Sequence, residues 1–224
     1  MKLDPSEPSA APWRVLPIRD FVDLVVDIEG TTYNRPWILA VDGRSGGGKT
    51  TVADLLHRCV PNSMVVHTDD VAWHHSFFDW SDLLIDGILK PLRNGSVVGY
   101  QPPGWQTHGR PGAIEIPTGL NLVIVEGVGA GRTEIMPWID RLIWVQSDLD
   151  EAEHRGIARD GGTQEARNFW HEWMAQEFDF FQRQRPWERA TAIVNGTPTQ
   201  SYNWNSQIIV SAVWPKSSPP GVAN

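Results

Sequence analysis

A glycine-rich run in the first quarter of the chain has the residue types and the spacing that bind a phosphate chain. The run "GRSGGGKT", at residues 43–50, matches the pattern G-x-x-x-x-G-K-[ST]. Glycines permit backbone angles that turn successive N–H groups toward anionic oxygens, and a helix that follows adds the positive end of its dipole. In this pattern the lysine, here Lys49, reaches the β- and γ-phosphates, and the hydroxyl of Thr50 ligates Mg²⁺. We therefore predict a nucleotide site made of Gly43, Ser45, Gly46, Gly47, Gly48, Lys49, Thr50 and Thr51.

Carboxylates stand at the ends of two apolar runs that follow this loop. Glu126 ends the run "LVIVE", where a lone carboxylate is costly unless it meets a cation or N–H donors. We interpret it as a Mg²⁺ group beside Thr50, and the alternative is a carboxylate that caps a helix near the surface. Asp69 and Asp70 end "SMVVHTDD", and adjacent side chains point to different sides, so only one should face the phosphates. That one could accept the proton of an attacking alcohol, and the alternative is a solvated strand end.

Unbroken apolar runs alternate with helical patterns, which indicates the fold that positions these residues. The expected strands are 36–43, 63–70, 120–127, 141–147 and 190–196, with 206–214 as a late edge strand. The expected helices are 20–28, 50–59, 81–95, 148–160 and 164–185. Strands that are apolar throughout are buried on both faces, and strands that alternate with helices form parallel sheets. We therefore predict an α/β protein, with a three-layer α/β/α P-loop NTPase fold and a central, mostly parallel five-stranded sheet. Ligands of such sheets bind beyond the carboxyl ends of the strands.

The domain organisation follows from the same pass along the chain. Residues 1–12 are rich in Pro, Ser and Ala, and we expect a disordered segment there. The remainder, 13–224, is expected to form one domain. Within it we expect an acceptor-binding insertion at about residues 70–118 and a lid at about residues 155–172.

The composition argues against several classes of partner. The 224 residues include 19 basic and 27 acidic ones, and the net charge of -8 repels nucleic acid and anionic lipid. No apolar run reaches the roughly 18 residues that span a bilayer, and the first residues lack the apolar core of a signal peptide. The single cysteine, Cys59, cannot form an internal disulfide. These features favour a cytoplasmic protein and leave a homo-oligomer open. Together with the phosphate loop and the strand-end acids, they leave a small-molecule phosphoryl acceptor as the expected partner.

Four further segments match the pattern of a known family. "TDDVAW" (68–73) stands where that pattern has a strand ending in Asp-x-aromatic, and "FDWSD" (78–82) stands where it has Phe-Asp-His-Pro-Asp. Glu126-Gly127 and Arg159-Asp160 match its Glu-Gly and Arg-Asp. With these segments the chain, from Ile38 to Thr197, resembles the uridine kinase group of P-loop small-molecule kinases and its bacterial relatives.

The resemblance implies roles for individual residues. Asp69 would be the catalytic base, with Asp70 as the second choice because a shift of one residue in the alignment exchanges them. Asp79 would grip the sugar hydroxyls of the acceptor. Lys49 and Arg159 would act on the transferring phosphoryl group. The region of "NGTP" (195–198) would lie beside adenine, and because the guanine-reading pattern N-K-x-D does not occur, ATP with Mg²⁺ is the predicted donor.

The acceptor and lid segments depart from the family. The family has Tyr-Asp-Phe and then His-Ser-Arg at its nucleobase pocket, whereas this chain has lost the aspartate and gained three residues. The acceptor contacts that the resemblance implies are therefore Tyr100, Trp105, His108 and Arg110. The family's lid carries Arg-Gly-Arg, whereas this chain has "DGGTQEAR", which leaves Arg167 as the late lid arginine.

Arg44, the aromatic residues and the histidines give weaker indications of function. Arg44, inside the loop, faces either solvent or the nucleotide base in this interpretation. Aromatic residues at helical spacing between 169 and 181 are expected in the core, whereas Trp73, Trp80 and Trp105 are expected to wall an acceptor pocket. His67, His74 and His75 lack a second group at zinc spacing, so Mg²⁺ chemistry is the better interpretation.

The leading functional hypothesis is a kinase that moves the γ-phosphoryl group of ATP to a hydroxyl of a small metabolite. Nucleosides such as uridine or cytidine come first, and pantothenate-like or glycerate-like acceptors come next. A nucleoside-monophosphate kinase would need more arginines than residues 70–110 offer, since only Arg93 and Arg110 are there. A nucleotide-dependent switch without an acceptor is the alternative from another class.

Overall fold

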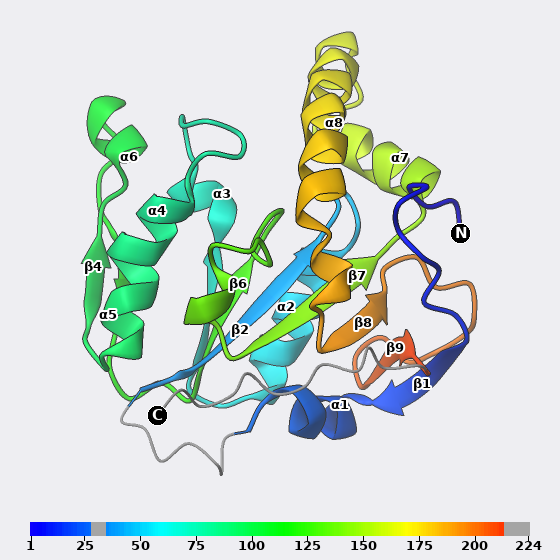
Figure 1. Ribbon diagram of the computed structural model, residues 1–224, viewed down its shortest axis with the longest axis horizontal. Helices are drawn as coiled ribbons and strands as arrows, with labels where there is room; N and C mark the ends of the chain where they lie inside the picture. The colour runs from blue at the N-terminus through cyan, green and yellow to red at the C-terminus, as the bar shows by residue number, and fades with distance from the viewer. Residues whose placement is uncertain (28–34, 213–224) are drawn as a thin grey trace.

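The computed structural model describes residues 1–27 and 35–212, and a seven-stranded sheet runs through its centre (Figure 1). The strand order is β1-β9-β8-β7-β2-β6-β3, and β4 and β5 form a separate two-stranded sheet. The strands of the large sheet are β1 (Trp13–Pro17), β2 (Trp37–Gly43), β3 (Ser63–His67), β6 (Leu122–Glu126), β7 (Arg141–Gln146), β8 (Ala192–Asn195) and β9 (Gln207–Ser211). Those of the small sheet are β4 (Val98–Tyr100) and β5 (Ile114–Ile116).

Eight α-helices are found in the described part of the chain. They are α1 (Ile18–Val25), α2 (Lys49–Cys59), α3 (Thr68–Val71), α4 (Ser81–Leu84), α5 (Lys90–Arg93), α6 (Pro103–Thr107), α7 (Leu149–Arg159) and α8 (Gln164–Gln184). A π-helical segment, Ile85–Leu89, joins α4 to α5, so the helix predicted over 81–95 is one continuous run. Short 3₁₀ turns are formed by Met136–Trp138 and Pro186–Glu188. Over residues 1–27 and 35–212, no helix is both long and apolar enough to cross a membrane.

The five predicted parallel strands are all present, but the sheet has seven strands rather than five. Strands β3, β6, β2, β7 and β8 pair in parallel, whereas β9 runs antiparallel to both β8 and β1. The predicted late strand is therefore β9, and β1 takes the edge position beyond it. Residues 13–17 give no strand signal of their own; they form a strand because the open edge of β9 offers unpaired N–H and C=O groups.

Alternate residues of each central strand face two separate apolar layers, which confirms the three-layer prediction. Leu39 and Val41 of β2 pack with α1 and α2, whereas Ile38 and Ala40 pack with the α4–α5 run and the end of α8. Strands buried on both faces are apolar at every position, as the sequence pattern required. The carboxyl ends of β2, β3 and β6 meet at one edge of the sheet, beneath α3 and α8 (Figure 1).

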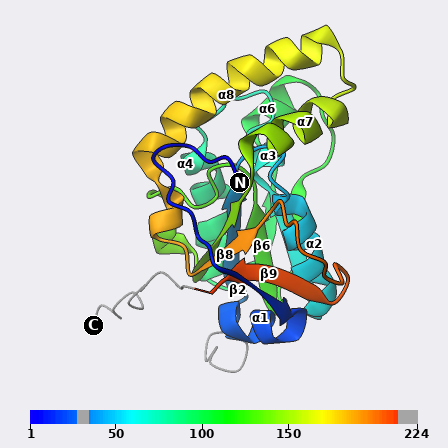
Figure 2. The same cartoon turned by 90° about the vertical axis from the view of Figure 1, so that its right-hand side faces the viewer.

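The N-terminal segment is not disordered, which corrects the prediction for residues 1–12. Its chain runs past α7 and α8 before it enters β1 (Figure 2). Glu7 is buried and accepts hydrogen bonds from Trp144 Nε1 at 2.6 Å and Gln146 Nε2 at 2.9 Å. The N–H of Leu149 also donates to the carbonyl of Lys2 at 3.0 Å. The partners lie more than a hundred residues away in sequence, so the local composition gave no sign of them.

Two predicted element ends fall outside the described residues. The helix predicted over 20–28 ends at Val25, and Ile28 itself lies outside the described part of the chain. The last two residues of the strand predicted over 206–214 lie outside it as well.

Candidate nucleotide and acceptor site

The glycine-rich loop connects β2 to α2 and has the backbone shape that its sequence predicts. Gly46 and Gly48 have φ of 70° and 95°, in the left-handed region that favours glycine. A Cβ on Gly46 would lie 2.0 Å from the carbonyl oxygen of Ala152, so no side chain fits there. Lys49 Nζ donates to the carbonyl of Arg44 at 3.0 Å, which folds the lysine back across the loop. Such a loop at the start of a helix fits the phosphates of a nucleotide.

Two cavities meet at this loop. The first, which we call the aromatic cavity, has a volume of about 530 Å³, and it contains the catalytic candidates Asp69 and Glu126. The second, which we call the β8–β9 cavity, has a volume of about 590 Å³ and lies along the outer side of the loop. Lys49, Thr50 and Arg159 line both cavities. The loop residues Gly46, Gly47, Gly48 and Thr51 line the β8–β9 cavity, and Ser45 lines the aromatic cavity.

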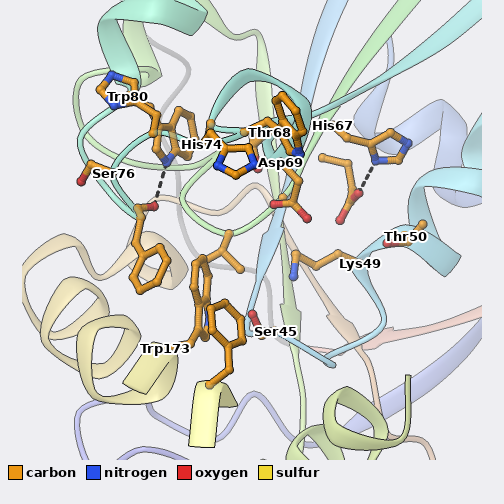
Figure 3. Close-up of a pocket in the computed structure, with 18 of the residues that line it drawn as sticks. Ser45, Lys49, Thr50, His67, Thr68, Asp69, His74, Ser76, Trp80 and Trp173 are labelled. Atoms are coloured by element: carbon orange, nitrogen blue, oxygen red, sulfur yellow. Dashed lines mark hydrogen bonds and ion pairs between the residues drawn. The ribbon is translucent and has the colours of Figure 1, made fainter. Parts of the chain in front are cut away.

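Asp69 lies in the aromatic cavity opposite the lysine. Figure 3 shows its carboxylate and the amino group of Lys49 directed into the same space, with Ser45 below and Thr50 beyond the lysine. Asp69 comes from α3, which follows β3 directly, whereas Lys49 begins α2 after β2. Two strands that end at the same edge of the sheet therefore bring an acid and a cation to the two sides of one cavity.

Asp70, the second candidate for the base, is directed elsewhere. Its Oδ1 accepts a hydrogen bond from Arg110 Nη2 at 2.8 Å, and its carbonyl accepts one from Trp105 Nε1 at 2.8 Å. The guanidinium of Arg110 lies 3.6 Å from the Trp105 ring centroid. None of these three residues lines either cavity. The arginine and the tryptophan that the resemblance assigned to the acceptor thus bind Asp70, and Asp69 alone of the pair faces the loop.

Glu126 is buried at the end of β6 and faces the aromatic cavity. Its Oε2 lies 2.8 Å from His67 Nδ1, and this hydrogen bond is the main reason that the pKa of His67 is raised above 6.5. The Thr50 hydroxyl and the Glu126 carboxylate are oxygen donors of the type that Mg²⁺ prefers, and both face one cavity beside the loop. Over the described ranges, no group of three or more His, Cys, Asp and Glu side chains could hold a metal ion on its own.

Arg159 is the predicted lid arginine that the structure brings to the loop. Its Nε donates to Asp160 Oδ1 at 2.8 Å, which is the largest of the interactions that raise its pKa; Asp69 and Glu126 contribute further. Arg167 does not reach the loop. It lies in a shallow groove on the other side of α7, with Asp150, Glu153 and His154. Helix α8 begins at Gln164, three residues before Arg167, so this arginine lies on the helix and not on the turn beside the loop.

Three further residues that the resemblance assigned to the acceptor, besides Trp105 and Arg110, do not line either cavity. Asp79 is exposed, and its backbone N–H donates to Ser76 Oγ at 3.2 Å. Tyr100 packs over Gly87, where an added Cβ would lie 2.6 Å from the ring. His108 stacks on His74 with ring centroids 4.0 Å apart, so it supports a lining residue without lining the cavity itself. Tyr100 and His108 belong to a segment that forms its own small sheet and helix, which holds these two side chains away from both cavities.

Aromatic side chains that the sequence assigned to the core form much of the aromatic cavity. Phe169, Trp170 and Trp173 of α8 line it, together with Phe77 from the loop before α4. Phe77 meets Trp173 at 5.0 Å between centroids, and Phe169 is 49% exposed. The aromatic residues between 169 and 181 therefore have two environments. Those in the first half of α8 line the cavity, whereas Phe181 is fully buried in the core as predicted. Helical spacing alone could not show where the helix leaves the sheet.

Asp42 is a buried acid beside the phosphate loop that sequence reasoning missed. It is fully buried one residue before the loop, and it accepts the N–H groups of Gly43, Gly129 and Gly131 at 2.7, 2.9 and 2.8 Å. Burial raises the pKa of Asp42 to about 6, even though these three donors lower it. The carboxylate thus joins the start of the phosphate loop to the turn that follows Glu126. Its position directly before the first glycine was the available signal.

Comparisons with known proteins agree with this architecture. No protein-family model matches the chain, and no curated protein matches it. A solved structure of a candidate fructose transport system kinase from Silicibacter sp. TM1040 is similar, with a TM-score of 0.54 and 13% identity, covering 74% of this chain and 92% of that one. A possible uridine kinase from Bacillus stearothermophilus has a TM-score of 0.45 and 19% identity, covering 79% and 98%. TT1252 from Thermus thermophilus has a TM-score of 0.42 and 20% identity, covering 74% and 91%. The first of these similarities shows a shared fold, which confirms the predicted mostly parallel α/β architecture.

Proposed function

We propose that the protein is an ATP- and Mg²⁺-dependent kinase of the uridine kinase-like type, which phosphorylates a hydroxyl group of a small molecule. One observation carries the proposal: Lys49 and Thr50 stand where two cavities meet, and the carboxylate of Asp69 faces them from the far side of one. A phosphoryl-transfer enzyme needs a donor site and an acceptor site that share the transferring group.

The β8–β9 cavity suits the donor nucleotide. The loop N–H groups and Lys49 would hold the β- and γ-phosphates, and the base would extend toward Asn195, Tyr202 and Trp204, which line the outer part of this cavity. Thr50 and Glu126 would hold Mg²⁺, which neutralises phosphate charge when it is bound. Trp204 is 60% exposed, and an exposed indole beside such a loop offers a stacking surface to a base.

The aromatic cavity suits the acceptor, with Asp69 as the base. Asp69 would take the proton of the acceptor hydroxyl while that oxygen bonds to the γ-phosphorus and the bond to the β-phosphate oxygen breaks. Arg159 lines both cavities and would face the charge that spreads over the transferring group. Trp173 and its aromatic neighbours would exclude water from this step, which limits hydrolysis of ATP.

The lining of the aromatic cavity favours an uncharged acceptor with a flat ring. Among the described residues that line it, the lysines and arginines are Lys49 and Arg159, and both belong to the phosphate end. A carboxylate or phosphate on the acceptor would otherwise meet only the histidines that line the cavity, His67, His74 and His75, and His67 already pairs with Glu126. Aromatic walls instead bury flat apolar surface. These points support a nucleoside over pantothenate-like, glycerate-like and nucleoside-monophosphate acceptors.

The test is product formation with a panel of acceptors. The protein is incubated with ATP, Mg²⁺ and separate nucleosides, vitamins and sugars, and both ADP and the phosphorylated product are measured. We expect a phosphorylated nucleoside, and we expect Lys49→Ala to abolish its formation. ADP release that no acceptor stimulates would refute the kinase proposal and favour the nucleotide-dependent switch. A product from an anionic acceptor would keep the kinase and refute the nucleoside.

A further inference from the structure

The phosphate loop carries a buried arginine that faces neither cavity, against the expectation of solvent or base for Arg44. Its side chain is 1% exposed. Three carboxylates surround the guanidinium: Asp4 Oδ2 lies 3.7 Å from Nη2, Glu7 Oε2 lies 3.5 Å from Nε, and Glu177 Oε2 lies 3.9 Å from Nη1. We call these four residues the Arg44 cluster. Two phenylalanine rings of α8 close it, at 5.0 and 5.1 Å from the guanidinium carbon.

Two of these carboxylates belong to the N-terminal segment, which is tied to the sheet on its other side. The Oε1 atom of Glu7 accepts from Trp144 and Gln146 of β7, and the N–H of Ala10 donates to Gln146 Oε1 at 2.9 Å. The backbone N–H of Lys2 donates to Asp148 Oδ2 at 2.6 Å, at the start of α7. The segment, which Figure 2 shows passing α7 and α8, therefore forms a strap that contacts Arg44 and is tied to β7 and to the start of α7.

The third carboxylate belongs to α8, which forms a wall of the aromatic cavity. The Oε1 atom of Glu177 accepts the N–H of Ser45 at 2.8 Å, so α8 binds the backbone of the phosphate loop as well as its arginine. Trp173, one turn earlier on the same helix, lines the aromatic cavity. A single guanidinium thus connects the loop, the strap and the cavity wall.

The cluster is held by charge and burial rather than by short hydrogen bonds. Within the described part of the chain, Nε, Nη1 and Nη2 of Arg44 have no hydrogen-bond partner, nor do the Oε2 atoms of Glu7 and Glu177. A buried charge that loses its partner is left uncompensated, so each member depends on the others. Burial raises the pKa of Glu7, and the charge of Arg44 opposes that rise. Movement of Arg44 with the loop would therefore alter the charge balance of both strap carboxylates, Asp4 and Glu7.

We propose that Arg44 is a positioning residue that couples nucleotide binding at the phosphate loop to the N-terminal strap and to α8. The proposal rests on the nucleotide binding in the proposed function and goes beyond it, because no residue of the strap lines either cavity. Coupling is reciprocal: if the strap holds the loop in its binding shape, a nucleotide in the loop must stabilise the strap by the same free energy.

The test uses the full chain and the double variant Asp4→Asn/Glu7→Gln. The amide oxygens can keep accepting from Ser6, Trp144 and Gln146, whereas an NH₂ group replaces each oxygen that faces the guanidinium. We expect its Kd for ATP with Mg²⁺, measured by calorimetry, to rise by about tenfold, within the usual range of coupling between sites. Glu188→Gln is the matched control, because Glu188 pairs with Arg185 on the surface, away from the loop. It should bind ATP like the wild type.

Hydrogen exchange gives a second readout that a merely structural role would not move. In the wild type, ATP should slow exchange of the backbone amides between residues 2 and 10, and in the double variant this slowing should be lost. Arg44→Met should also lose it; if that variant does not fold, the double variant decides. The coupling would be overturned if the double variant bound ATP within twofold of the wild-type Kd and ATP did not slow amide exchange in the strap of the wild type. Absence of ATP binding to the wild type would instead refute the proposed function.

Discussion

Replacing Asp42 by Asn should make the stability difference from the wild type depend on pH. Asp42 is fully buried, and its carboxylate accepts three backbone N–H groups from the two turns that border the aromatic cavity. The Asn side chain has the same shape as Asp but only one carbonyl oxygen. The variant therefore loses a hydrogen-bond acceptor and is less stable than the wild type. The substitution also removes a carboxyl group that titrates. This second effect on stability can be measured separately, because it changes with pH and the loss of an acceptor does not.

The magnitude follows from the raised pKa. Burial raises the pKa of Asp42 from 3.8 to about 6 in the folded protein. This difference corresponds to about 3 kcal/mol, since each pKa unit is worth about 1.4 kcal/mol. The folded state binds the proton more tightly than the unfolded state, so Asp42 stabilises the fold fully below pH 3.8 and loses this contribution as the pH rises through about 6. About 2 kcal/mol of the loss falls between about pH 4.5 and pH 7.

Urea unfolding of the wild type and Asp42→Asn at these two pH values is the assay. Relative to the wild type, the variant should gain about 2 kcal/mol of unfolding free energy as the pH rises. Asp148→Asn is the control: the N–H of Lys2, with other donors, lowers the pKa of Asp148, so its contribution is lost only below this window. A difference between wild type and Asp42→Asn that is the same at both pH values would refute the reasoning.

Three further predictions concern the site. Asp69→Asn should lower kcat by about a hundredfold or more while the Kd for ATP stays unchanged, and Asp70→Asn, whose carboxylate pairs with Arg110, should keep kcat within a few-fold; steady-state kinetics that reverse the two would exchange their roles. Gly156→Ala should lower the free energy of unfolding by about 1–3 kcal/mol, because its Cβ would lie 1.9 Å from the Trp170 ring. Gly99→Ala meets no atom within 4 Å and is its control in urea unfolding. Trp204→Ala should raise the Kd for ATP about fivefold or more without loss of thermal stability, since stacking on a base is worth about 1–3 kcal/mol; an unchanged Kd would place the base elsewhere.

The parts of the site that the sequence predicted are those encoded in short contiguous segments. The phosphate loop, the strand before it and the helix after it were all expected, and α2 begins at Lys49, one residue before the predicted start. Asp69 and Glu126 also face the loop, because each ends a strand of the same parallel sheet and such ends meet at one edge. Local pattern and sheet topology together were enough for these residues.

The parts that the sequence did not predict depend on which side a segment turns after it leaves the sheet. Tyr100, Trp105 and Arg110 lie in the acceptor-binding insertion, where the chain forms a small sheet and a helix of its own. Arg167 follows a turn that directs it away from the loop. A resemblance carries residue types across such segments, but an insertion or a shortened turn changes the direction of every side chain beyond it.

The sequence by itself determined the five parallel strands, the phosphate loop and the acids at the strand ends. Periodicity and glycine spacing act over a few residues, where backbone sterics and burial fix the outcome. Only the tertiary structure decided that Asp69 rather than Asp70 faces the loop, that the aromatic stripe of α8 walls a cavity, and that Arg44 is buried under a strap. Asp4, Glu7 and Glu177 lie far from Arg44 in the chain, so their attraction to it exists only once the fold has brought the charges together.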